Sequence, residues 1–205
     1  MNGRRLLLAT RARHKVAELR DLLDLPGAIL VTADEVGIEG EPVEDADSFA
    51  ANAEIKVRYY AERSGLPTLA DDSGLEVDAL GGRPGVATRR YAGEDATDAD
   101  NNARLLGELE GLPAEQRRGR YQCVLAFLDP ASGAPPVFRE GTMGGRIATL
   151  PRGSGGFGYD PIFEPLSEPP GGRTVGQMSA AEKHALSHRG QAARAMAEYL
   201  RSRGW

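Results

Sequence analysis

A polar turn near the start of the chain carries residue types that bind phosphate. Residues 10–15 read Thr-Arg-Ala-Arg-His-Lys and stand between a short apolar run and a segment with helical periodicity. Helix N-termini present unpaired N–H groups and a partial positive charge, so anions bind there. The hydroxyl of Thr10, two arginines and Lys15 add hydrogen-bond donors for phosphate oxygens. A solvated basic turn is the alternative interpretation, because the glycine spacing of a Walker A loop is absent.

Two adjacent carboxylates form the second candidate. Asp71 and Asp72 follow apolar residues 68–70, which predict a short strand, and precede Ser73-Gly74. Adjacent carboxylates repel each other unless a cation lies nearby. Mg²⁺ takes few carboxylates and shares the rest of its shell with phosphates and water, so it suits this pattern. An acidic loop containing Glu44 lies upstream, whereas an ordinary Asx turn at Asp-Ser-Gly is the competing interpretation.

A glycine-rich segment is the third candidate. Residues 153–161 read Gly-Ser-Gly-Gly-Phe-Gly-Tyr-Asp-Pro. A phenylalanine between glycines can present its ring to a planar base, and such stacking contributes about 1–3 kcal/mol. Asp160 can accept a hydrogen bond from a base N–H. The alternative is a tight turn whose Phe157 and Tyr159 enter the core.

A basic segment near the C-terminus is the fourth candidate. Lys183 and the run Ser187-His188-Arg189-Gly190 supply donors for oxyanions or carbonyls, although a histidine in such a run is often a solvated surface residue. Phosphate donors, carboxylates for Mg²⁺ and an aromatic glycine loop together describe a nucleoside triphosphate site. Each signal separately is weak to moderate, so the inference depends on their combination.

Hydrophobic periodicity indicates which elements must position these segments. We expect strands at residues 6–9, 29–32, 68–70 and 121–127, and one or two more within residues 137–149. We expect helices over residues 13–23, over residues 48–63 with Ser48 as N-cap, after a Thr97–Asp100 capping box, and from about Arg189. Residues 34–47, 153–158 and 165–172 read as loops. This order predicts an α/β fold with a mixed sheet flanked by helices.

Composition excludes several classes of protein. The chain of 205 residues has 25 Lys+Arg and 30 Asp+Glu, and its net charge of −5 disfavours general nucleic-acid binding. Its 26 Gly and 13 Pro are spread between apolar runs, which indicates many loops in a folded protein. The single Cys123 excludes an internal disulfide and a cysteine-based zinc site. Without a signal peptide after Met1–Arg5 or an apolar stretch of about 20 residues, we expect no membrane span and a cytoplasmic protein.

Ordered motifs along nearly the whole chain carry a resemblance to a known family. They lie in residues 8–19, 48–56, 69–78, 81–85, 90–101, 155–163, 182–183 and 187–190. They include LADDSGL at 69–75, RYAG at 90–93, GGFGYDPIF at 155–163 and SHRG at 187–190. Their ordered combination is highly specific, whereas no single match would be. The chain thereby closely resembles the inosine/xanthosine triphosphate pyrophosphatase family of RdgB/HAM type.

This resemblance implies a fold, an activity and partners. The fold would be one domain over residues 1–205, elongated, with two lobes around a central mixed sheet and an active-site cleft between the lobes. The activity would be Mg²⁺-dependent hydrolysis of ITP, dITP and XTP to the monophosphate and pyrophosphate, which cleanses the nucleotide pool. The protein would be a homodimer that binds neither nucleic acid nor membrane.

The resemblance also implies roles for individual residues. The triphosphate would be held by Lys56 and by the turn Thr10, Arg11, Ala12, Arg13, His14 and Lys15. Glu44 and Asp72 would bind Mg²⁺, and Asp72 would be the general base, with Lys15 and Lys56 as the other catalytic residues. Further substrate contacts would come from Asn52, Ser73, Phe157, Gly158, Tyr159, Asp160, Lys183, His188 and Arg189.

Two positions depart from the family pattern. Ala12 stands where the family has Asn, and Ala51 stands where it usually has Glu. Loss of a hydrogen bond to a charged phosphate costs about 1.5–3 kcal/mol, which bidentate contacts from Arg11 or Arg13 would offset. We expect an active pyrophosphohydrolase. The alternatives are a nucleotide-binding protein with weak or no catalysis, and a phosphatase or pyrophosphatase that acts on another phosphorylated metabolite with the same Mg²⁺ site.

Overall fold

The computed structural model describes residues 3–205, so residues 1 and 2, the start of the segment considered for a signal peptide, lie outside the described part. The described chain forms strands β1 (Arg4–Leu8), β2 (Ala28–Thr32), β3 (Thr68–Val77), β4 (Arg118–Leu128), β5 (Val137–Ile147) and β6 (Phe163–Pro165). Its α-helices are α1 (Arg13–Leu22), α2 (Phe49–Ser64), α3 (Asp98–Glu108), α4 (Ala180–Leu186) and α5 (His188–Ser202). Within residues 3–205, no helix has the length and apolar character needed to cross a membrane.

One sheet contains the six strands in the order β2-β1-β3-β4-β5-β6. Strand β1 pairs in parallel with β2, Leu6 opposite Leu30, and with β3, Leu7 opposite Thr68. Strand β5 pairs antiparallel with β6. The sheet is therefore mixed, which confirms the predicted α/β class.

The chain divides into two compact units. Unit 1 contains the described residues up to Asp72, residues 123–141 and residues 189–205, and unit 2 contains residues 73–122 and 142–188. The division passes between Asp72 and Ser73 within β3, so neighbouring residues of one strand belong to different units. The single 1–205 domain remains a prediction.

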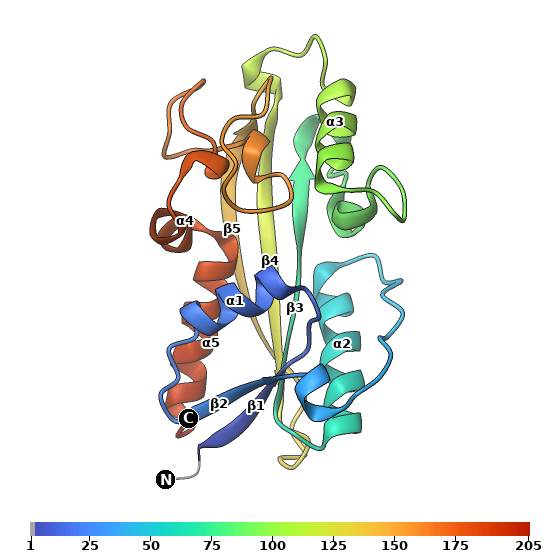
Figure 1. The fold of residues 1–205 in the computed structure, drawn as a ribbon, viewed down its shortest axis with the longest axis vertical. Helices are drawn as coiled ribbons and strands as arrows, with labels where there is room; N and C mark the ends of the chain where they lie inside the picture. The colour runs from blue at the N-terminus through green and yellow to red at the C-terminus, as the bar shows by residue number, and fades with distance from the viewer. Residues whose placement is uncertain (1–2) are drawn as a thin grey trace. The chain divides into compact units, whose positions relative to one another are not determined.

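The core of unit 1 forms where helices cover the strands. Leu6 and Leu8 of β1, Leu69 of β3, and Cys123 and Leu125 of β4 project from one face of the sheet. The buried side of α5 packs on them with Ala192, Ala193, Met196, Ala197 and Leu200. Figure 1 shows α1 and α5 on one side of these strands and α2 on the other. Both faces of β3 are therefore covered in this unit.

The core of unit 2 joins strand and loop residues to α3. It includes Leu75, Leu105, Tyr121, Tyr159 and Phe163. Helix α3 begins with the predicted capping box, because Thr97 accepts from the Asp100 N–H while the Asp100 side chain accepts from the Thr97 N–H. A second capping box, Ser179 with Glu182, opens α4.

Most predicted elements are confirmed, including a strand that begins at Thr68, but the expected end of that strand at residue 70 is wrong. Strand β3 continues to Val77, so Asp71 and Asp72 lie inside a strand rather than after it, and the Asx turn is excluded. Polar residues with low strand propensity concealed this continuation. Two smaller corrections concern a 3-10 helix at Asp34–Val36 within the expected loop, and α4, which the sequence reading missed.

Candidate functional site

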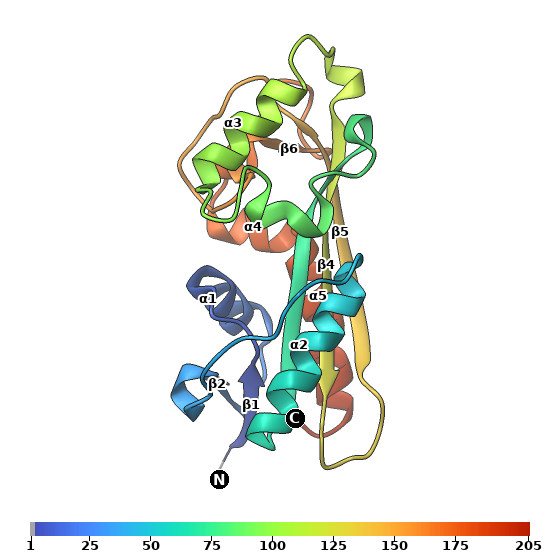
Figure 2. The same cartoon turned by 90° about the vertical axis from the view of Figure 1, so that its right-hand side faces the viewer.

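Strand β3 separates two groups of charged side chains in unit 1. Successive residues of a strand point to opposite faces, so Asp71 and Asp72 project in opposite directions. Asp72 contacts Lys56 of α2, whereas Asp71 contacts Lys15 of α1 and Arg189 of α5. Both views place β3 between α1 and α2 (Figures 1 and 2). Two neighbouring carboxylates thus take part in two distinct clusters.

The first cluster centres on the ammonium of Lys56. Its Nζ lies 2.7 Å from Glu44 Oε2 and 2.8 Å from Asp72 Oδ1. Burial by itself would lower the pKa of Lys56, but Asp72, Asp71 and Glu44 outweigh burial and raise it. Burial raises the pKa of Asp72 above its ordinary value, against the lowering effect of Lys56. Lys56 is therefore a firmly charged cation beside a carboxylate whose ionised form is destabilised by burial.

The same two carboxylates are suited to a divalent metal. Oxygens of Glu44 and Asp72 converge on one cation, and both are ligands that Mg²⁺ prefers. Residues 3–205 contain no group of three or more His, Cys, Asp or Glu side chains arranged for a metal. Mg²⁺ commonly uses one or two carboxylates and completes its shell with substrate phosphates and water. The residues present therefore fit Mg²⁺ held by two carboxylates.

The second cluster is a row of alternating charges. Lys15 Nζ lies 2.9 Å from Asp71 Oδ1, and Arg189 donates to Asp71 Oδ2 from Nε and Nη2, each at 3.2 Å. Arg189 Nη1 donates to Glu18 Oε2 at 2.6 Å. Burial would raise the pKa of Asp71, but Lys15, Arg189 and Lys56 hold it well below its usual range. Asp71 is consequently a fully ionised, buried carboxylate.

The turn at residues 10–15 leads from β1 into α1, as predicted. Ala12 is the N-cap residue and provides no side-chain hydrogen bond, and the first turn contains no acidic residue. The Ala12 N–H donates to Thr10 Oγ1 at 3.3 Å. Burial, Lys15 and Arg189 together lower the pKa of His14. Helix starts usually carry acidic residues, because the helix dipole is positive there, but α1 begins with Arg13, His14 and Lys15 and has no side-chain cap. A sequence that conflicts with the local helix preference in this way is typical of a functional site.

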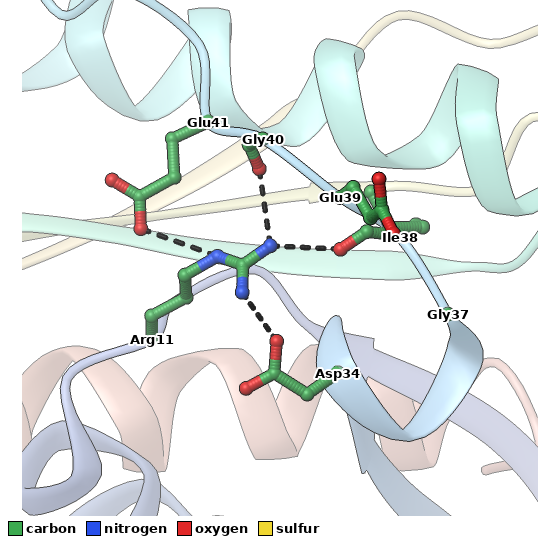
Figure 3. Close-up of a pocket in the computed structure, with 7 residues that line it drawn as sticks. All are labelled: Arg11, Asp34, Gly37, Ile38, Glu39, Gly40 and Glu41. Carbon is green, nitrogen blue, oxygen red and sulfur yellow. Dashed lines mark hydrogen bonds and ion pairs between the residues drawn. The ribbon is translucent and has the colours of Figure 1, made fainter.

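Arg11 points away from this helix start into an open pocket of about 450 Å³ (Figure 3). Its guanidinium contacts the carboxylates of Asp34 and Glu41 and donates to the carbonyls of residues 38 and 40. These contacts tie the 10–15 turn to the acidic loop that carries Glu44. Because its donors already have protein acceptors, Arg11 is poorly placed to replace the missing Asn at position 12.

Asn52 also holds the acidic loop. Its side chain accepts from the Ala46 N–H at 3.1 Å and donates to the Ala46 carbonyl at 3.3 Å. It is buried on α2, one helical turn before Lys56. The structure thus places Asn52 as a support for the segment that contains Glu44.

In unit 2, Asp160 organises the glycine-rich loop. Its Oδ2 accepts from the Phe157 N–H at 3.0 Å and from Lys183 Nζ at 2.7 Å. Lys183 Nζ also lies 4.0 Å from the centroid of the Phe157 ring, a cation–π distance. A Cβ at Gly156, where φ is +75°, would lie 2.0 Å from Asp160 Oδ2, so only glycine fits there. The loop therefore fixes Phe157, Asp160 and Lys183 together.

The two aromatic residues of this loop have different environments. Tyr159 is 2% exposed and its hydroxyl donates to the Thr88 carbonyl, so it belongs to the core, as the alternative interpretation held. Phe157 is only partly buried. His188, also predicted as a site residue, stacks on Tyr121 with ring centroids 4.7 Å apart and planes at 4°. Ser73 lies on β3 in this unit.

Helix α3 supplies two contacts that the sequence reading missed. Asp98 accepts from the Gly158 N–H at 2.7 Å, and Asn102 donates to the Gly158 carbonyl at 3.0 Å. The two side chains are four residues apart on one face of the helix, so both can hydrogen-bond to the backbone of Gly158, one to its N–H and one to its carbonyl. The four-residue spacing of Asp98 and Asn102 indicates that they share a helix face, but the sequence does not show that the glycine-rich loop lies against that face.

Comparison with known proteins gives the family. The Ham1 family model matches residues 6–199. The chain belongs to the Ham1 family. A "dITP/XTP pyrophosphatase" of Halorhodospira halophila is 47% identical over 192 residues, covering 94% of each chain. One of Escherichia coli strain K12 is 42% identical over 198 residues, which cover 97% of this chain and 98% of the relative.

Solved structures agree with this Ham1 assignment. A HAM1 protein from Coxiella burnetii superposes with a TM-score of 0.87 at 38% identity, covering 97% of this chain and 99% of that one. A "nucleoside-triphosphatase / dITP/XTP pyrophosphatase" from Mycobacterium abscessus gives a TM-score of 0.76 at 41% identity, with 94% and 98% covered. The Ham1 match spans both units, which confirms the resemblance inferred from the motifs.

The two departures of this Ham1 protein from the family pattern occupy helix starts. Ala12 is the N-cap of α1. Ala51 is the third residue of α2, and its N–H donates to the N-cap side chain of Ser48. A Glu at this position would complete a capping box with Ser48. The Glu of the family at position 51 is therefore explained by helix capping. Position 12 instead lies at the start of α1, the helix that carries Lys15, where a side chain could contact phosphate.

Proposed function

We propose that this Ham1 protein is a nucleoside triphosphate pyrophosphohydrolase that converts ITP, dITP and XTP into the monophosphate and pyrophosphate. The names of its relatives, dITP/XTP pyrophosphatases over nearly full length, support this substrate class. The observation that carries the chemistry is the convergence of Glu44 and Asp72 on the Lys56 ammonium. This cluster offers carboxylates for a metal and a buried cation for phosphate.

In unit 1 we assign phosphate binding and proton transfer. Lys15 and Lys56 would neutralise charge on the triphosphate, together with the N–H groups at the start of α1. Glu44 and Asp72 would hold Mg²⁺, which supplies further neutralisation of the phosphate charge when bound. Asp72 would accept the proton of the attacking water, and a carboxylate whose pKa is raised by burial is a better proton acceptor.

In unit 2 we assign recognition of the base. Phe157 would stack on the purine, and Lys183, held by Asp160, would donate towards the 6-oxo group. His188 would contribute a further polar contact. A 6-amino group at that position would be rejected, because its N–H donors would face the Lys183 ammonium, which is itself a donor. Guanine shares the 6-oxo group, so discrimination against GTP must act at the 2-position of the ring.

We also propose that the protein works as a cytoplasmic homodimer, as its family resemblance implies. The alternative of nucleotide binding with little turnover is motivated by Ala12, because alanine lacks the side-chain amide donor that Asn would offer to phosphate. Ala51 does not favour that alternative, since its position is explained by the Ser48 cap.

Product analysis tests the proposal. The protein is incubated with Mg²⁺ and, separately, ITP, XTP, dITP, GTP and ATP, and products are resolved by ion-exchange chromatography and ³¹P NMR. We expect monophosphate and pyrophosphate from the first three nucleotides, and no turnover after chelation with EDTA. Tight ITP binding without turnover would favour the alternative, whereas orthophosphate release or indifference to the base would indicate a different phosphatase.

A further inference from the structure

Within the row of charges on the Asp71 face of β3, only Lys15 has a role in the chemistry assigned above, although the row is the more deeply buried of the two clusters. The side chain of Asp71 is 0% exposed and that of Arg189 is 1% exposed. Glu18 is 12% exposed and Lys15 is 19% exposed. The row therefore begins in the protein interior and is most exposed to solvent at the Lys15 side chain.

We propose that Asp71 is a positioning residue that orients the Lys15 ammonium towards the triphosphate, and that Arg189, itself anchored by Glu18, fixes Asp71. The inference rests on the proposed function, because it concerns how that function's phosphate-binding lysine is held. Arg189 in this account acts through Asp71 instead of contacting the base.

The position of Lys15 explains why it needs such a partner. Lys15 is the third residue of α1, where the helix dipole disfavours a cation and no acidic side chain of the same turn compensates. A lysine side chain also has many rotamers, so an unheld ammonium would sample several directions. A buried carboxylate 2.9 Å away counters both effects and selects one direction.

The geometry of Arg189 explains why Asp71 itself is rigid. Two nitrogens of the guanidinium donate to one oxygen of Asp71, Oδ2, while Oδ1 lies towards Lys15. The third nitrogen donates to Glu18, three residues after Lys15 on α1. Two cations and two anions thus balance, and both ends of the row return to the same helix. Asp71 cannot replace Asp72 as general base, because it is buried on the opposite face of β3.

A double-mutant cycle tests this role. kcat and KM for dITP are measured with Mg²⁺ for the wild type, Asp71→Asn, Lys15→Met and the double variant, with Asp21→Asn on the exposed side of α1 as control. If Asp71 acts through Lys15, Asp71→Asn lowers kcat by about tenfold to a hundredfold in the wild-type background. It causes less than about a twofold further loss in the Lys15→Met background. KM does not rise, because the substitution removes a negative charge from an anion site.

The possible results separate the proposal from simpler explanations. An equal loss from Asp71→Asn in both backgrounds would show a general structural effect, including partial misfolding, and would overturn the positioning role. If Asp71→Asn does not fold, Glu18→Gln replaces it in the same cycle, with a smaller loss expected only when Lys15 is present. A wild type that does not hydrolyse dITP would refute the proposed function and this inference with it, whereas an active wild type with equal losses refutes the inference alone.

Discussion

Units 1 and 2 build their candidate sites with different interactions. In unit 1, ion pairs link side chains from separate elements, as when Arg189 of α5 bridges Asp71 of β3 and Glu18 of α1. In unit 2, hydrogen bonds to the backbone of one loop, at Phe157 and Gly158, hold that loop, and an ion pair between Asp160 and Lys183 adds to them. Charge therefore sets the geometry of the first site, and loop shape sets that of the second.

This difference indicates how each site should respond to substitution. An isosteric change of charge leaves packing intact but removes the force that orients the ion pairs of unit 1. The loop of unit 2 depends on glycine conformations and on contacts from α3, so truncation of an apolar or amide side chain should affect it more. We expect kcat effects from the first site and KM effects from the second.

The largest effect is expected from Asp72→Asn. Loss of the general base should lower kcat by about 10²–10⁴-fold, while the substitution keeps the volume of the side chain and hence the fold. Steady-state kinetics with dITP and circular dichroism provide the measurement. Asp129→Asn is the matched control, because Asp129 lies in the same unit, 4.0 Å from Arg4, and Asn can still accept the Ala131 N–H that Asp129 binds. Normal turnover in Asp72→Asn would remove Asp72 from the chemistry.

Phe157→Ala should mainly affect binding. Loss of base stacking worth about 1–3 kcal/mol raises KM by about fivefold to 150-fold, with little change in kcat. Phe138→Ala provides the control, since Phe138 is a partly buried phenylalanine on β5 in unit 1. An unchanged KM for Phe157→Ala would contradict base stacking and the contrast between the two units.

The hydrogen bonds from α3 to Gly158 predict a smaller increase in KM when one of them is removed. Asn102→Ala removes a hydrogen bond to the loop, with a net value of about 0.5–1.5 kcal/mol, so KM should rise by about twofold to tenfold. Asn101→Ala is the control for simple destabilisation, because Asn101 bonds to Arg89 and Ala92 and not to the loop. Equal KM values for both variants would show that α3 does not position the base-binding loop.

Ala51→Glu should have the smallest effect. A capping box completed with Ser48 stabilises α2 by about 0.3–1.5 kcal/mol, measured by thermal or urea denaturation, while kcat/KM stays unchanged. A large gain in kcat/KM would instead place position 51 in the reaction. That result would revive the hypothesis that this chain is a weakened enzyme.

The sequence predicted the elements whose local signals agree. Ser48 caps α2, and Thr97 and Asp100 form the capping box of α3. The alternating apolar residues from Tyr121 to Phe127 lie in β4. It failed at β3, because Asp71 and Asp72 have low strand propensity and their stabilising partners are distant in the chain. Arg189 follows Asp71 by 118 residues, and no local pattern predicts such a contact.

Side-chain roles were predictable only in part for the same reason. Motif resemblance selected Lys56, Glu44 and Asp72, which the fold brings into direct contact. It could not reveal that Arg11 is bonded to the acidic loop or that Tyr159 is a core residue, because both outcomes depend on which face each residue presents. It also assigned no role to Asp71, which neighbours Asp72 on β3 but projects from the opposite face of the strand.

The division of labour between the two units is tested most directly by base selectivity. The ratio of kcat/KM for dITP over dATP is measured in the wild type, Lys15→Met and Lys183→Met. We predict that Lys15→Met lowers both values and leaves the ratio unchanged, whereas Lys183→Met lowers the ratio by at least about tenfold. An unchanged ratio in Lys183→Met, or a collapsed ratio in Lys15→Met, would contradict the assignment of phosphate chemistry to unit 1 and base recognition to unit 2.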